Sequence, residues 1–467
     1  MDFSSMTVWT FVIQMGIVFA ALLFANFLRQ HSPVVKNSLM PVAVLAGFMV
    51  LALKYIGRGF GFDFLNGELY EMIVYHAIAL GFIAMTLRTT DDSKEDAVKF
   101  TGLRSGAIIV STYLVQGIVG LAVTIGLALT VMPNLFPAAG LLLPMGFGQG
   151  PGQANNVGTT YEAAGFAGGR SFGLAIAACG YVIACTIGVV ILNILRHRGK
   201  LMPRGEAKAE EVSVSYFQGE DELPVSDSID RLSIQLSLVF VVYLITYAVT
   251  VGLTTFMTSI GLGDMLNSIL WGFNFIIASV VAILVRIFFK QGTEKKFIKK
   301  QYQNNYLLNR ISGFFFDIMI VCGIASIDVE DLHGLFVPFI LMAALGGVLT
   351  WVWLTVVCKQ VYKGYFYEGL LSMFGMLTGT IGSGVLLLRE IDPNYETPAA
   401  NNLVVGSSFG ILFGAPMLIL IGIAKAGLSK SLLTLGLVAA YLIILAAIIF
   451  FVKPKEQAGV PAEKIEE

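Results

Sequence analysis

The sequence predicts an all-α polytopic membrane protein with two inverted repeats of five transmembrane helices, each carrying a re-entrant hairpin, plus an extra C-terminal helix. Hydrophobic residues make up 56% of the 467-residue chain and charged residues only 13%, whereas soluble domains have about 25% charged residues. Apolar runs long enough to cross about 30 Å of hydrocarbon recur along the chain, and a β-barrel would instead show short alternating segments. Two glycine-rich interruptions, one in each half, break this pattern and suggest the hairpins.

Eleven apolar runs are expected to span the membrane. The first run has no basic segment before it, so we interpret it as a retained span and not as a cleaved signal. The predicted spans cover residues 8–27, 39–56, 71–87, 106–131, 171–195, 234–257, 265–289, 308–326, 333–358, 408–425 and 431–452.

The predicted organisation has four parts. Residues 1–196 form an N-terminal repeat, and the charged, Gly- and Pro-containing stretch 197–233 reads as a cytoplasmic linker. Residues 234–425 form a C-terminal repeat, and 426–467 hold the extra helix and a cytoplasmic tail. The re-entrant hairpins lie at about 133–169 and 364–407.

Lysine and arginine indicate the orientation. If the N-terminus lies outside and the C-terminus in the cytoplasm, most of the 30 basic residues fall on the inner side. The basic residues left outside are Lys54, Arg58, Arg170, Lys425 and Lys430, and the acidic turn 328–331 also falls outside.

This orientation requires that both hairpin segments enter and leave the membrane on one side. Each is too apolar for an ordinary loop and too interrupted by Gly, Pro and Asn for a span. Non-helical backbone at membrane depth is tolerated only where protein or a water-filled cavity satisfies it. We expect the first hairpin to enter from outside and the second from inside, with the substrate site where they meet. Two short echoes, 154–156 with 400–402 and 171–173 with 408–410, accompany the repeat at unequal spacing.

The first hairpin contains the stretch PMGFGQGPGQANN over residues 144–156. Its alternating glycines fit neither GxGxxG nor a Walker A loop, which argues against phosphate binding. Alternating glycines bring backbone dipoles close to a small ion or a carboxylate, and the amides add neutral donors and acceptors. A tight helix contact through small residues is the alternative. The predicted substrate-binding residues here are Gly148, Gln149, Gly150, Gly152, Asn155 and Asn156.

The second hairpin combines hydroxyl side chains with glycines over residues 378–384. Such a surface offers hard oxygen ligands that suit Na⁺. We assign Thr378 and Gly379 to the substrate, and the predicted ion-binding residues of this hairpin are Thr380, Gly382, Ser383 and Gly384.

Three ionisable residues inside apolar segments have open roles. Arg389 either pairs with a substrate carboxylate or forms a local ion pair with Glu390 or Asp392. Asp317 is a candidate Na⁺ ligand, proton carrier or partner of Arg389, or else a packing residue. His76 could relay a proton or serve as a hydrogen-bonded packing group.

Several functions are not expected. A net charge of −1 argues against nucleic-acid binding, and the sequence offers no positioned catalytic base or metal cluster, so no catalytic residue, cofactor or resident metal is predicted. The four cysteines show no metal-binding or disulfide spacing.

At these residues the chain resembles the bacterial sodium:glutamate symporter family over roughly residues 5–425. Residues 148–152 lie where that family has a Gly-Gly-His-Gly-Thr-Ala type sequence, and 378–384 lie where it has a second glycine-rich loop. Residues 172–180 look like the family's span after the first hairpin. The chain departs from the family pattern in three places. Gln149 stands where the family often has His, Pro151 stands where it has Thr, and an eleventh span follows the second repeat.

The resemblance implies a homodimer in the bacterial cytoplasmic membrane. It also implies a scaffold part and a mobile part that carries the hairpins, which together import glutamate with Na⁺ by an elevator-type motion. The alternatives are Na⁺- or H⁺-coupled transport of another small carboxylate or amino acid, and a channel.

Overall fold

The computed structural model describes residues 6–37, 40–88, 95–201, 228–261, 267, 270–272, 274–295, 302–392 and 397–451. All regular structure in these ranges is helical. The longer helices are α1 (Met6–His31), α3 (Val42–Gly59), α4 (Gly67–Thr86), α5 (Glu95–Leu129), α7 (Gly169–His197), α8 (Ser228–Ser259), α10 (Asn274–Glu294), α11 (Asn305–Ala325), α12 (Phe336–Val361), α15 (Ala399–Ala424) and α16 (Leu428–Phe451). The shorter elements are α2 (Pro33–Asn37), η2 (Pro137–Leu141), η3 (Pro144–Gly148), α6 (Pro151–Glu162), η6 (Glu330–Leu332), α13 (Phe366–Thr378) and α14 (Ile381–Arg389).

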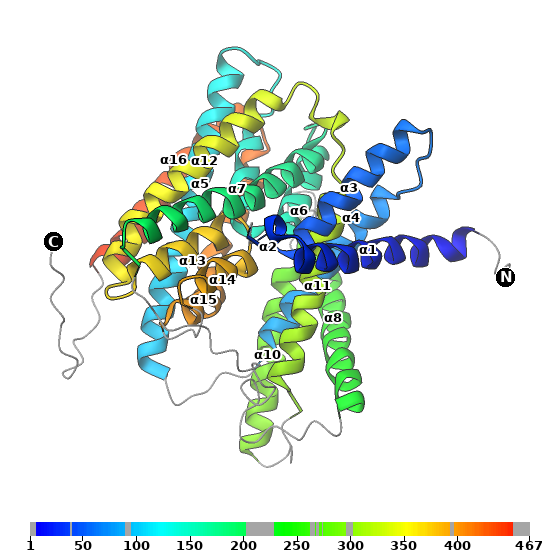
Figure 1. The fold of residues 1–467 in the computed structure, drawn as a ribbon, viewed down its shortest axis with the longest axis vertical. Coiled ribbons are helices and arrows are strands. Elements are labelled where there is room, and N and C mark those ends of the chain that lie inside the picture. The colour runs from blue at the N-terminus through cyan, green and yellow to red at the C-terminus, as the bar shows by residue number, and fades with distance from the viewer. Residues whose placement is uncertain are drawn as a thin grey trace.

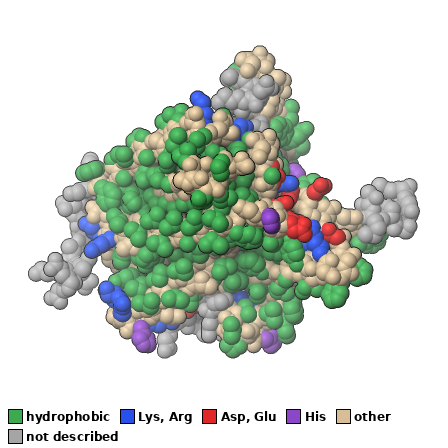
Figure 2. Space-filling model, turned by 90° about the horizontal axis from the view of Figure 1, so that it is seen from above, with side chains coloured by type: hydrophobic (Ala, Val, Ile, Leu, Met, Phe, Trp, Pro, Cys, Tyr) green, Lys and Arg blue, Asp and Glu red, His purple; other side chains and the backbone are tan. Residues whose placement is uncertain are grey.

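Ten helices of the described part are long and apolar enough to cross a membrane. They are the longer helices named above except α15, and each overlaps a predicted span. The predicted tenth span corresponds to α15, which contributes a shorter apolar stretch over Phe413–Ala424. Most of the surface seen in Figure 2 is hydrophobic, as expected of helices that face lipid. A polytopic, all-helical membrane protein is therefore confirmed.

The helices form two bundles (Figure 1). The first bundle contains α1, α3, α4, α8, α10 and α11, which pack on one another. The second bundle contains α5, α7 and α12 to α16, together with η2, η3 and α6. Helix α6 lies between the bundles and contacts both α7 of the second bundle and α4 and α11 of the first.

Each bundle draws its helices from both halves of the chain in the same order. Three long helices of each half belong to the first bundle. From the N-terminal half these are α1, α3 and α4, and from the C-terminal half α8, α10 and α11. The next helix, a broken segment and a further helix then enter the second bundle. The two halves therefore contribute equivalent sets of elements, and α16 joins the second bundle as an addition.

Two glycines let the backbones of α5 and η2 contact each other directly inside the second bundle. A Cβ placed on Gly120 of α5 would lie 1.9 Å from the carbonyl oxygen of Gly140 in η2, a distance that no side chain could occupy. Small residues allow this backbone-to-backbone contact, which fixes the start of the first broken segment against α5.

The predicted end of the second hairpin needs correction. Helix α15 begins at Ala399, directly after Pro398, so the predicted hairpin 364–407 includes the first turns of a continuous helix. The echo between 154–156 and 400–402 also does not join equivalent positions, because the first copy lies within α6 and the second opens α15. The echo of 171–173 at 408–410 likewise lies at the start of α7 but well inside α15.

The predicted linker 197–233 falls mainly on residues 202–227, which lie outside the described residues, as does the tail after residue 451. At its two ends, α7 continues to His197 and α8 begins at Ser228.

Candidate functional site

The first helix break lies at Gln149 and Gly150, between η3 and α6. η3 is a π-helical turn that ends at Gly148, and α6 begins at Pro151. Gly150 has a φ of 81°, a left-handed conformation that favours glycine, and proline suits the first position of a helix because it lacks an N–H group. The sequence Gly-Gln-Gly-Pro-Gly thus ends one helix and starts another.

The second helix break lies at Gly379 and Thr380, between α13 and α14. α13 ends at Thr378 and α14 begins at Ile381. A Cβ on Gly379 would lie 2.8 Å from the Ser383 hydroxyl and 3.0 Å from the carbonyl oxygen of Gly375. A side chain here would crowd the Ser383 hydroxyl and the last turn of α13, so glycine suits the position where the chain leaves this helix.

Neither short helix has a side-chain cap at its N-terminus. The residue before α6 is Gly150 and the residue before α14 is Thr380, and neither makes a capping hydrogen bond. The first backbone N–H groups of a helix have no partner within the helix and carry partial positive charge. The two breaks thus present two positive helix ends that can interact with an anion.

The two breaks meet beside Tyr181 of α7. A Cβ on Gly150 would lie 3.6 Å from Thr380 Cγ2 and 3.6 Å from Tyr181 Oη. A Cβ on Gly379 would lie 3.1 Å from Cδ1 of the same tyrosine ring. Residues about 230 positions apart in the chain therefore form one centre, with the tyrosine between them.

Buried polar atoms without hydrogen-bond partners concentrate in these segments. Leaving such an atom unpaired typically costs about 1–3 kcal/mol, so each one calls for a ligand, an ion or a water molecule. Among the described residues, the unpartnered atoms of the broken segments and their flanking helices are Gln116 Oε1, Gln153 Nε2 and Oε1, Asn155 Oδ1, Asn156 Nδ2 and Oδ1, Tyr181 Oη and Ser383 Oγ.

Gln116 of α5 connects the two broken segments. Its Nε2 donates hydrogen bonds to the Leu377 carbonyl at 2.8 Å and to Thr350 Oγ1 at 2.9 Å. Its Oε1 would lie 3.2 Å from a Cβ on Gly148. The bond to Thr350 is the interhelical hydrogen bond usual for a lone polar residue in an apolar span, and the bond to Leu377 places Gln116 beside the second break.

Six of the predicted site residues lie at the two breaks. Gly148, Gln149 and Gly150 form the first break, and Gly379, Thr380 and Ser383 form the second. Gly152 and Asn156 are one turn apart on α6, and Gly152 packs against Ile78 and Met319 of the first bundle. Asn155 is buried in the same helix.

Three predicted residues of the second hairpin have other surroundings. The Thr378 hydroxyl donates to the Phe374 carbonyl at 2.8 Å within its own helix. Gly384 packs on α13, since a Cβ there would lie 2.4 Å from the Ser372 carbonyl oxygen, and Gly382 is exposed. Packing accounts for Gly384, and the exposed Gly382 contributes its backbone N–H group to the N-terminus of α14.

Arg389 lies away from this centre. It ends α14, eight residues and about 12 Å along the helix from Ile381, and its side chain is exposed. Among the described residues Arg389 forms no ion pair with either predicted local partner. Glu390 interacts with Arg196, and Asp392 accepts hydrogen bonds from Thr397.

Asp317 lies about halfway along α11. Its carboxylate interacts electrostatically with Tyr181 of α7, although its side chain remains accessible at the molecular surface. An ionised side chain halfway along a span must face a polar space and not lipid. The predicted partnership with Arg389 is not observed, and Asp317 instead lies on the side of the two breaks.

His76 belongs to a packing contact. Its Nδ1 lies 2.7 Å from the Tyr243 hydroxyl, which also accepts a hydrogen bond from Asn274 Nδ2 at 3.3 Å. This contact joins α4, α8 and α10 within the first bundle and fits the packing interpretation of His76.

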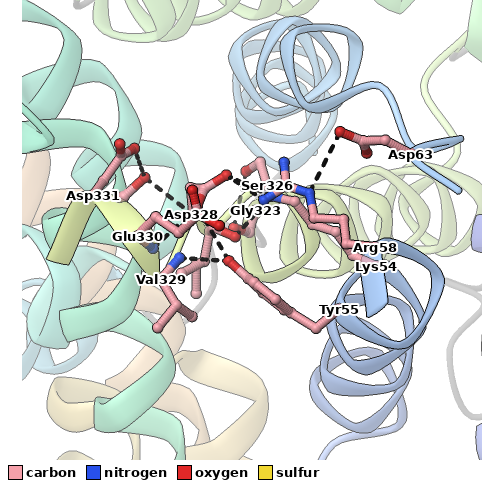
Figure 3. Close-up of polar contacts among 12 residues, drawn as sticks. Lys54, Tyr55, Arg58, Asp63, Gly323, Ser326, Asp328, Val329, Glu330 and Asp331 are labelled. Carbon is pink, nitrogen blue, oxygen red and sulfur yellow. Dashed lines mark hydrogen bonds and ion pairs between the residues drawn. The ribbon is translucent and has the colours of Figure 1, made fainter. Parts of the chain in front are cut away.

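A polar cavity of about 850 Å³ is lined by residues of both bundles, from α1, α3 and α4, from α7 and from the loops beside them. Lys54 Nζ lies 3.5 Å and Arg58 Nη1 3.0 Å from Asp328 Oδ2 (Figure 3). Burial raises the pKa of the Asp328 carboxyl, but the hydrogen bond from Arg58 and the charge of Lys54 outweigh it, so the pKa lies below its usual value.

Arg170 of α7 pairs with Glu71 of α4 and thereby connects the second bundle to the first. Of the charged residues predicted to lie outside, Lys54, Arg58, Arg170, Asp328 and Asp331 line this cavity, whereas Lys425 and Lys430 do not. Figure 2 shows acidic side chains gathered on one side of the view.

Tyr181 and Gln116 are the site residues that sequence reasoning missed. Both stand in long apolar helices, where a single polar group usually packs against a neighbour. No protein-family model and no curated protein matches the chain, so similarity to known proteins assigns no role to these residues.

Proposed function

We propose that the protein is a secondary active transporter that imports glutamate together with Na⁺ across the bacterial cytoplasmic membrane. The observation that carries this proposal is the meeting of two broken helices, with uncapped N-termini and unpartnered buried polar atoms, beside Tyr181. Secondary transporters bind their solutes where broken helices meet, with positive helix ends directed at anionic groups. The proposal assigns the chain transport and no catalysis.

The substrate carboxylate would lie between the N-termini of α6 and α14. Asn155, Asn156 and Ser383 would supply neutral hydrogen-bonding groups, because their buried polar atoms have no partner among the described residues. The carbonyl at the end of α13 and the Ser383 hydroxyl are hard oxygen donors that suit Na⁺.

Asp317 gives a physical reason for coupling to Na⁺. Its negative charge lies on the side of the two breaks and would repel an anionic substrate. A Na⁺ ion bound beside it would remove this repulsion, so that the cation and the carboxylate favour each other's binding. A membrane potential of 100 mV supplies about 2.3 kcal/mol for each net charge moved.

The arrangement of the bundles suggests an elevator-type motion. The second bundle carries both breaks, and the first bundle, which contacts it mainly through α6, would be the scaffold. We propose that the equivalent contributions of the two halves reflect inverted repeats with re-entrant hairpins. Following the resemblance and the charge distribution, we further propose a homodimer with the N-terminus outside and the C-terminus in the cytoplasm.

Uptake by purified protein in proteoliposomes tests this function. A panel of amino acids and dicarboxylates is offered with an inward Na⁺ gradient, an inward H⁺ gradient or neither. Na⁺-driven, saturable accumulation of glutamate is expected. Accumulation of a different carboxylate, or with H⁺ alone, would replace the proposed substrate or ion, and a flux that does not saturate would favour a channel.

Replacing Ser383 or Asn156 with Ala should raise the substrate or Na⁺ concentration needed for half-maximal uptake by about fivefold, the equivalent of one hydrogen bond of about 1 kcal/mol. Ser383 Oγ and both polar atoms of the Asn156 side chain make no hydrogen bond with the described residues, so the melting temperature should change little. Ser372→Ala is the matched control, because the Ser372 hydroxyl donates to the Gly369 carbonyl at 3.1 Å within α13. Unchanged half-maximal concentrations in both variants would remove the site assignment.

Replacing Asp317 with Asn should weaken the Na⁺ dependence of glutamate binding. Two unit charges about 8 Å apart interact by about 2 kcal/mol at an effective dielectric constant of 20. The ratio of glutamate affinities with and without Na⁺, measured by calorimetric titration, should therefore fall by about tenfold or more. Asp63→Asn removes a carboxylate from the cavity between the bundles and should leave this ratio unchanged. An unaltered ratio in Asp317→Asn would exclude Asp317 from coupling.

A further inference from the structure

Tyr181 occupies the position where all parts of the proposed site converge. Its side chain is completely buried, and both breaks lie against it, Gly150 at the hydroxyl and Gly379 at the ring. The preceding residue, Gly180, packs directly on the Thr378 carbonyl and on Phe147. α7 therefore holds this tyrosine in a fixed place between the two broken segments.

Among the described residues, no group makes a hydrogen bond of normal length and angle with the Tyr181 hydroxyl. The Thr380 side chain is within reach of the hydroxyl without completing such a bond, and the Asp317 carboxylate acts on it through its charge. A buried hydroxyl without a partner is costly, and in a transporter a ligand can supply what the protein lacks.

The surroundings of the hydroxyl favour an anionic ligand group. The uncapped N-termini of α6 and α14 begin beside it, at the two residues that follow the breaks. A phenolic O–H group can donate to a carboxylate, and hydrogen bonds to charged groups contribute about twice as much as neutral ones. A cation would instead seek the carbonyl ends of η3 and α13.

We propose that Tyr181 is a specificity-determining residue of the transport site and that its hydroxyl donates a hydrogen bond to the substrate carboxylate. This inference rests on the proposed function. It makes α7 a third wall of the site, next to the two breaks, and it gives the site a fixed donor in addition to the backbone N–H groups.

Glutamate titration of purified Tyr181→Phe in the presence of Na⁺ tests the inference. Phenylalanine keeps the ring between the breaks and removes only the hydroxyl. The dissociation constant for glutamate should rise by about tenfold to a hundredfold, the loss expected for a hydrogen bond to a charged group. The melting temperature of the substrate-free protein should stay the same or rise slightly, because the lost hydroxyl makes no hydrogen bond of normal geometry with the described residues.

Tyr362→Phe provides the matched control. Tyr362 is equally buried, but its hydroxyl donates to Ser105 Oγ at 2.9 Å. This variant should have a lower melting temperature and an unchanged dissociation constant, the reverse of Tyr181→Phe.

The outcomes separate the inference from the proposed function. If wild-type protein binds glutamate and Tyr181→Phe binds it equally well, the inference is wrong and the transport proposal stands. If Tyr181→Phe loses stability and affinity together, as a packing residue would, the inference is also wrong. If the wild-type protein binds neither glutamate nor any other carboxylate of the panel, the proposed function fails and the inference with it.

Discussion

Oxidation of a chain that carries Pro151→Cys and Gly323→Cys should abolish uptake, and reduction should restore it. A Cβ on Gly323 of α11 would lie 2.8 Å from the Cβ of Pro151 at the start of α6, so a small adjustment reaches the roughly 3.5–4.5 Å of a disulfide. This bond would join the first bundle to the second. If transport requires the bundles to move past each other, the cross-linked protein cannot complete a cycle.

The chain offers a closely matched control for this cross-link. A Cβ on Gly47 of α3 would also lie 2.8 Å from the Cβ of Ile324, the next residue of α11, but both belong to the first bundle. Oxidation of Gly47→Cys with Ile324→Cys should leave uptake intact. The four native cysteines, all free thiols, are first replaced with Ala, since Cys322 adjoins both pairs. Full uptake by a protein in which mass spectrometry finds the 151–323 bond complete would rule out relative motion at this contact.

Replacing Gly180 with Ala should reduce uptake by about tenfold or more. The added Cβ would lie 2.2 Å from the carbonyl oxygen of Thr378 and 2.9 Å from Phe147 Cδ1, so it meets both broken segments at once. Overpacking of this kind typically costs about 1–3 kcal/mol, and here relief requires the breaks to move away from Tyr181. Initial uptake rates in proteoliposomes, normalised to the amount of folded protein, measure the effect.

Gly126→Ala serves as the control for this substitution. A Cβ on Gly126 of α5 has no atom within 4 Å, so the same change of residue type should leave the uptake rate as it is. Wild-type rates in Gly180→Ala would mean that the close packing of α7 on the breaks is not needed for transport.

The breaks themselves could be predicted from sequence because their cause is local. Glycine and proline change the backbone at the residue where they stand. Glycines and prolines around Gly150, and glycines around Gly379, therefore mark the two interruptions directly. The long apolar spans were predictable for the same reason, since the membrane imposes length and composition on each span separately.

The remaining site depends on contacts that sequence spacing does not reveal. Tyr181 and Gln116 matter because two distant segments meet beside them, and in sequence each is one polar residue in an apolar helix. The placement of Arg389 failed for a related reason. Closeness in sequence to the second break suggested closeness in space, but a straight helix of nine residues carries Arg389 away from it.

Counterflow of labelled glutamate tests the central claim most directly. Proteoliposomes are loaded with unlabelled glutamate and Na⁺ and diluted into labelled glutamate, without any ion gradient. A carrier whose single site is exposed alternately to each side predicts a transient accumulation of label inside, which Ser383→Ala should diminish. Simple equilibration of label without an overshoot, in protein that is folded and correctly reconstituted, would contradict an alternating site at the two helix breaks.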